Sequence, residues 1–94
     1  MHGPNYAYKN ITAAGQYNIA TTAGVLRAII VNTTAAGTIA AVDGNATAGT
    51  VATMGTLKAS IAENTYRYDT AFGTGLRITT TAASDITVVF TTGI

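Results

Sequence analysis

The stretch VLRAIIVNTT, residues 25–34, decides the fold, because it contains the longest strongly apolar run of the chain. Side chains alternate between the two faces of a strand, and here both faces are largely apolar. One face would carry Leu26, Ala28 and Ile30, and the other Val25, Arg27, Ile29 and Val31. A strand that is apolar on both faces is usually covered on both. The pattern therefore predicts a central strand of a layered β protein.

Outside this strand, the chain repeats short runs rich in β-branched and aromatic residues, separated by Gly, Asn and Asp. This spacing is typical of a sandwich or barrel, and no segment has the apolar period of an amphipathic helix. Further strands are expected at 16–21, 38–42, 51–54, 57–61, 65–72, 76–81 and 86–92. About eight short strands in one domain predict an all-β fold, a single jelly-roll-like antiparallel β-sandwich.

The segments between these strands give further expectations. Gly3 and Pro4 disfavour regular structure, so residues 1–10 are expected to form an extended N-terminal arm, in which a strand could start at residues 6–8, and residues 11–94 the sandwich domain. Asp43-Gly44 with the following Asn45 predicts a turn, and residues 44–50 a loop. The two last strands, 76–81 and 86–92, are expected to pair as a hairpin.

The composition points to association between protein molecules. Charged residues make up 10% of the 94 residues, the formal net charge is +1, and there is no cysteine. The basic residues are scattered singly, so a specific nucleic-acid partner is not expected. No apolar run approaches the roughly 18 residues that cross a bilayer, so no membrane partner is expected either. A small domain without disulfides and with few charges is favoured to associate with itself or with other proteins.

Side chains that could carry out chemistry are few and lie far apart in the sequence. The acids are Asp43, Glu63, Asp69 and Asp85, the one histidine is His2, and the serines are Ser60 and Ser84. General acid–base catalysis needs titratable groups held in one pocket, and no such pair has a recognisable spacing. Asp43-Gly44-Asn45 lacks the remaining ligands of a Ca²⁺ loop. We therefore expect no enzyme activity, no metal site and no cofactor.

Candidate residues for protein contacts are the aromatic and basic ones. Tyrosine supplies apolar area together with a hydroxyl group and is favoured at interfaces. Tyr6 and Tyr8, with Lys9, are expected to grip a neighbouring molecule, although the two tyrosines could instead close the edge of the sandwich. Three basic side chains are expected to pair with acidic residues at the rim of an interface: Arg27, Arg67 and Arg77.

Several motifs resemble small structural proteins of tailed bacteriophages. A hydrophobic strand ends in Val31-Asn32 and leads to Asp43-Gly44; later, YDTAFGTGL at 68–76 precedes DITVVF at 85–90. The resemblance covers residues 24–91 and leaves the N-terminal arm outside. It implies a jelly-roll-like sandwich and a role in the virion.

The function that this resemblance implies is that of a capsid decoration (cement) protein on the capsid surface. Such a protein would self-associate, here as a homotrimer, and bind the major capsid protein across the junctions between its subunits. The alternative is a tail or fibre module that joins tail parts or binds host carbohydrate. That alternative predicts an exposed aromatic platform, for which Tyr66 and Tyr68 are the candidates.

Overall fold

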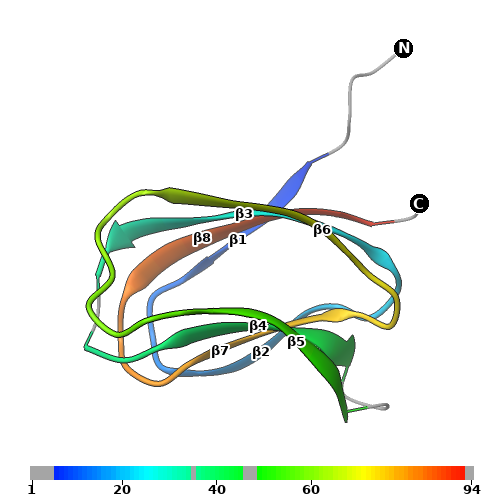
Figure 1. Ribbon diagram of the computed structural model, residues 1–94, viewed down its shortest axis with the longest axis horizontal. Coiled ribbons are helices and arrows are strands. Elements are labelled where there is room, and N and C mark those ends of the chain that lie inside the picture. The colour runs from blue at the N-terminus through cyan, green and yellow to red at the C-terminus, as the bar shows by residue number, and fades with distance from the viewer. Residues whose placement is uncertain (1–5, 35, 46–48, 93–94) are drawn as a thin grey trace.

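The computed structural model describes residues 6–34, 36–45 and 49–92 and confirms the all-β sandwich (Figure 1). The described residues form eight strands, the number expected from the sequence. Their bounds are β1 Ala7–Ile11, β2 Gly15–Ala20, β3 Gly24–Thr33, β4 Ile39–Asn45, β5 Gly49–Leu57, β6 Thr65–Phe72, β7 Leu76–Thr80 and β8 Asp85–Thr92. Among these residues there is no helix that could cross a membrane.

The strands form two antiparallel sheets with the strand order of a jelly roll. One sheet has the order β1-β8-β3-β6 and the other β2-β7-β4-β5, and Figure 1 shows them as two layers. Only β4 and β5 are both consecutive in the chain and neighbours in a sheet. Every other connection crosses from one sheet to the other, which is how a jelly roll encloses its core between two four-stranded sheets.

The core lies between the two sheets and takes apolar side chains from both. The side chains that are fully buried are Phe72, Ile11, Leu26, Ile29, Leu76, Ile78, Ile86 and Val88. In β3 the register shifts between Leu26 and Ala28. This β-bulge places Leu26 and Ile29 in the core and leaves Arg27 and Ala28 together on the outer face. The strict alternation expected for this strand is therefore wrong from Ala28 onward, because a bulge adds a residue to one strand of a pair.

Three expectations about connections are also wrong. β7 and β8 do not form a hairpin, because β7 pairs with β2 and β4 while β8 pairs with β1 and β3. Asp43, Gly44 and Asn45 lie within β4 and do not form a turn. The separate strands expected at 51–54 and 57–61 are not formed, since β5 continues through Gly55 to Leu57 and residues 58–61 are not in a strand. A Cβ at Gly55 would stand 3.0 Å from the Tyr68 ring, so the glycine makes room for that ring.

The N-terminal segment contributes a strand to the sheet. β1 pairs with β8 from Ala7 opposite Phe90 to Ile11 opposite Ile86. Ile11 reaches the core, which fixes this edge strand to the sandwich. Residues 7–10, expected to be part of an arm, thus belong to the sheet. Residues 1–5 lie outside the described part of the chain.

Candidate protein-interaction face

Four of the predicted contact residues meet on the outer face of the β1-β8-β3-β6 sheet, which we call the β8 face. Tyr6 precedes β1, Tyr8 lies in β1, Arg27 in β3 and Arg67 in β6. Tyr6 is 56% and Tyr8 74% exposed, and they are the large apolar side chains that the described residues leave most open to solvent. The antiparallel register brings these residues from distant parts of the sequence to one side of the sheet.

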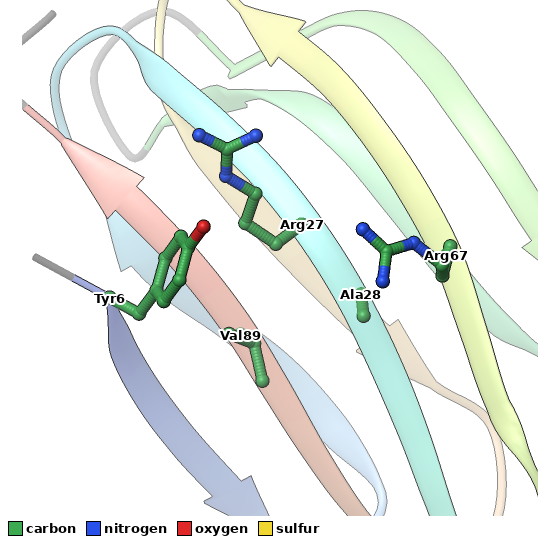
Figure 2. Close-up of a pocket in the computed structure, with 5 residues that line it drawn as sticks. All are labelled: Tyr6, Arg27, Ala28, Arg67 and Val89. Atoms are coloured by element: carbon green, nitrogen blue, oxygen red, sulfur yellow. The ribbon is translucent and has the colours of Figure 1, made fainter. Parts of the chain in front are cut away.

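The register also places one row of side chains across all four strands. Tyr8 pairs with Val89, Val89 with Ala28, and Ala28 with Arg67. Val89 and Ala28 are the floor of a shallow hollow of about 170 Å³, with Tyr6, Arg27 and Arg67 around it. Figure 2 shows Tyr6 and Arg27 on one side of this hollow and Arg67 on the other. The hollow has an apolar floor and a basic rim.

Two guanidinium groups on this face share one carboxylate. The Nη1 of Arg27 is 3.6 Å from Oδ1 of Asp69, and the Nη2 of Arg67 is 3.3 Å from its Oδ2. The guanidinium of Arg27 also lies 5.4 Å from the centre of the Tyr6 ring, within the range of a cation–π interaction. Its Nε is shielded from solvent and, among the described residues, has no hydrogen-bond partner. These three charges sum to a positive centre beside the apolar floor.

Asp69 holds this position through an unusual backbone conformation. Its φ is 48°, in the left-handed region, where Asp and Asn are tolerated better than most residues. The register of β3 against β6 shifts at the same place, between Leu26 and Ala28. Asp69 was not among the contact residues predicted from the sequence, and neither were Ala28 and Val89. The one signal for Asp69 is its spacing from Arg67, since residues two apart share a strand face.

The other two predicted contact residues lie elsewhere. Arg77 is 9% exposed and belongs to the other sheet. Its Nε donates to Oδ1 of Asn18 at 3.2 Å and its Nη2 to the carbonyl oxygen of Asn45 at 2.7 Å. These bonds tie β7 to its neighbours β2 and β4, so Arg77 has a structural role. Lys9 is exposed in β1 opposite Val88, on the other side of the strand from Tyr8.

The exposed aromatic platform expected from Tyr66 and Tyr68 is not formed. Both rings pack against the core, and the Tyr66 hydroxyl donates to the carbonyl oxygen of Ala62. Burial raises the pKa of the Tyr68 hydroxyl. The alternation that placed these two residues on one face is correct, but that face points inward.

Asp43 uses its carboxylate to hold the loop between β6 and β7. Its Oδ2 accepts a hydrogen bond from the backbone N–H of Gly73 at 3.1 Å, and its Oδ1 accepts from those of Thr74 at 2.9 Å and Gly75 at 3.3 Å. Burial acts to raise the pKa of Asp43, but these three donors outweigh it and the pKa is lowered. Both carboxylate oxygens are thus engaged by the protein's own backbone.

Asp43→Asn is expected to lower the free energy of unfolding by about 1–2 kcal/mol at neutral pH, because the three amides lose a charged acceptor. The folded-state pKa lies below the unfolded value of 3.8. The contribution is therefore complete above that value and is lost as the pH falls through the folded-state pKa. Urea unfolding at a series of pH values would measure both effects. A variant whose stability falls below about pH 4 as steeply as that of the parent would show that Asp43 is not the group responsible.

Asp85, in β8, is held by side chains from the two strands beside it, β1 and β3. Asp85 accepts hydrogen bonds at its Oδ1 from the side-chain amides of Asn10 at 2.8 Å and Asn32 at 3.3 Å. Ser84 is buried, and the predicted terminal histidine, His2, lies outside the described residues. Within ranges 6–34, 36–45 and 49–92, no three His, Cys, Asp or Glu residues lie close enough to hold a metal ion.

Comparison with known proteins supports the fold. No protein-family model and no curated protein matches the chain. A solved structure, the Drosophila NLP-core, matches 92% of this chain and 95% of its own with a TM-score of 0.56 at 9% sequence identity. That structure is described as providing insight into pentamer formation and histone binding by that protein. At this identity the likeness extends to the β-sandwich alone.

Proposed function

We propose that this chain is a structural protein of a tailed-bacteriophage virion, a capsid decoration protein that binds the major capsid protein through the β8 face. The observation that carries the proposal is that both strongly exposed tyrosines stand on the same sheet face as a pair of arginines. Tyrosine and arginine are enriched among the residues that dominate binding energy at protein interfaces. The motifs at 68–76 and 85–90, similar to those of phage structural proteins, direct the proposal to the virion.

The size of the β8 face explains why such a protein would act as an oligomer. The four strands β1, β8, β3 and β6 have 5, 8, 10 and 8 residues. At about 3.3 Å per residue and about 4.8 Å between strands, they give a face of roughly 500 Å². A typical stable interface takes about 800 Å² from each partner, so one copy alone would bind weakly. A homotrimer seated across a junction between capsid subunits would engage three faces at once and gain avidity. The pentamer reported for the similar sandwich supports self-association of this architecture.

Histone binding is not carried over from that neighbour. Histones are basic, and the β8 face of this chain presents the guanidinium groups of Arg27 and Arg67. Like charges placed opposite one another disfavour a complex. An acidic partner surface is the better complement.

Tyr8→Ala is expected to weaken binding to expanded, undecorated heads of the phage that encodes the chain at least tenfold, with the binding measured by co-sedimentation. The variant removes an exposed aromatic anchor, a change that often weakens binding tenfold or more, about 1.4 kcal/mol. Thr56→Ala, at an exposed position in β5 of the opposite sheet, is the matched control and is expected to bind as the parent does. Failure of the parent protein to bind such heads would refute the proposal, and equal loss in both variants would refute the choice of face.

A further inference from the structure

The hollow on the β8 face has the size of a site for one side chain. Its volume of about 170 Å³ is well below the roughly 300–1,000 Å³ of pockets that hold cofactors and drug-sized ligands. A hollow of this size suits a group of a few heavy atoms, such as the end of one side chain.

The charges around the hollow determine which group fits. Arg27 and Arg67 both reach Asp69, so one negative charge is shared by two positive ones. The side chain of Arg67 is 77% exposed and is free to turn toward a second anion at little cost. The Nε of Arg27 is shielded and has no partner in the described residues. A carboxylate entering here would meet two guanidinium groups, the pairing that arginine geometry favours.

We propose that the hollow receives an aspartate or glutamate side chain of the partner protein, with an apolar neighbour of that residue resting on Val89 and Ala28. Asp69 acts in the free protein as an internal stand-in that holds the two guanidinium groups in place and competes with the incoming carboxylate. The inference rests on the proposed function in that the partner surface would be the capsid. It deepens that function by naming the residue type that the face selects.

The apolar floor and the isolation of the two arginines favour a protein over a nucleic acid. A nucleic-acid strand is held by a track of cations that follows successive phosphates. The hollow offers one positive centre, while Lys9 is on the other side of β1 and Arg77 is bonded within the other sheet. A single acidic side chain beside an apolar one matches the floor and the rim together.

The test is an NMR titration of the whole chain with two capped tripeptides, acetyl-Leu-Glu-Leu-amide and its Gln counterpart. We expect the Glu peptide to shift the amide signals of Ala28, Arg67 and Val89 with a dissociation constant on the order of 1 mM. The Gln peptide should shift them at least severalfold less. Equal shifts by both peptides, or a response to a short oligothymidylate in preference to the Glu peptide, would overturn the proposal.

Asp69→Asn provides the decisive variant. Asparagine tolerates the left-handed backbone conformation of this position and has the same shape, but it no longer neutralises the arginines. We expect it to bind the Glu peptide about two- to fivefold more tightly. Arg67→Gln should bind about two- to fivefold more weakly, while Lys58→Gln, which removes a distant charge, should match the parent. Unchanged or weaker binding by Asp69→Asn contradicts the competing role of Asp69.

The two proposals can fail separately. If the parent protein binds phage heads but the Glu peptide does not perturb the hollow, the inference about the carboxylate is wrong and the proposed function stands. If the peptide occupies the hollow but the protein never binds heads, the proposed function is wrong and the acid-selective site stands.

Discussion

Gly24→Ala is expected to lower the free energy of unfolding by about 3 kcal/mol or more, because a side chain cannot be placed there without moving the backbone. Gly24 begins β3 and pairs with both Phe72 of β6 and Thr92 of β8. An added Cβ would overlap the carbonyl oxygen of Thr91 and stand 2.8 Å from Cζ of Phe72. A domain of this length is stable by about 5–14 kcal/mol. Urea unfolding followed by circular dichroism would measure the loss.

Gly73→Ala is the matched control for Gly24→Ala. Gly73 lies in the connection between β6 and β7, and the nearest atom to an added Cβ is Oδ2 of Asp43 at 3.9 Å, an ordinary van der Waals separation. Its free energy of unfolding is expected to stay within about 0.5 kcal/mol of the parent value. If Gly24→Ala lowered the free energy of unfolding as little as Gly73→Ala does, a small shift of β8 would be enough to relieve the overlap. The explanation given for Gly24 would then be wrong.

The strands could be predicted where local pattern alone determines them. Residues 65–72 alternate cleanly between two faces and are bounded by a turn and a glycine, and β6 has these bounds. The partners of a strand are different, because pairing depends on contacts between residues far apart in the chain. The apolar faces of β7 and β8 are compatible with a hairpin, and equally with strands in two sheets that face each other across one core. The structure has the second arrangement, in which each sheet buries the apolar face of the other.

Turn and strand-end signals in the sequence give the wrong prediction where contacts between distant residues outweigh them. Asp43-Gly44 is a strong turn pair, yet Asp43 binds three amides of the loop between β6 and β7 and Gly44 continues β4. Gly55 would normally end a strand, but the Tyr68 ring covers it and β5 passes through. The bulge at Arg27 has no marker in the sequence, although it decides which side chains of β3 reach the outer face.

The contact residues could be chosen by type but not by place. Tyrosine and arginine are common interface residues, and five such positions together with Lys9 are the six candidates. The register of β1, β8, β3 and β6 gathers four of them, whereas Arg77 is buried against Asn18 and Lys9 is on the other side of β1. Ala28 and Val89 have no distinguishing chemistry, and they matter only because the register places them between Tyr8 and Arg67.

Phe72→Ala is expected to lower the free energy of unfolding by about 3–5 kcal/mol, a large part of the whole. Phe72 is 1% exposed and is the largest of the fully buried side chains. Its removal leaves a cavity between the sheets where the ring contacts Gly24, and surrounding strands cannot close it without breaking their pairing. Phe72→Leu, which keeps most of the apolar volume, should be clearly milder, and both are measured by urea unfolding.

Tyr8→Ala removes a ring of similar size from a side chain that is 74% exposed, so its free energy of unfolding should stay within about 0.5 kcal/mol of the parent value. The contrast with Phe72→Ala tests what the two aromatic positions are for. If Tyr8→Ala destabilises the protein as strongly as Phe72→Ala does, Tyr8 closes the edge of the sandwich, and its ring serves folding stability and not the binding of a partner. If it leaves stability intact while binding to phage heads is weakened, the ring is kept on the surface for contact with another molecule.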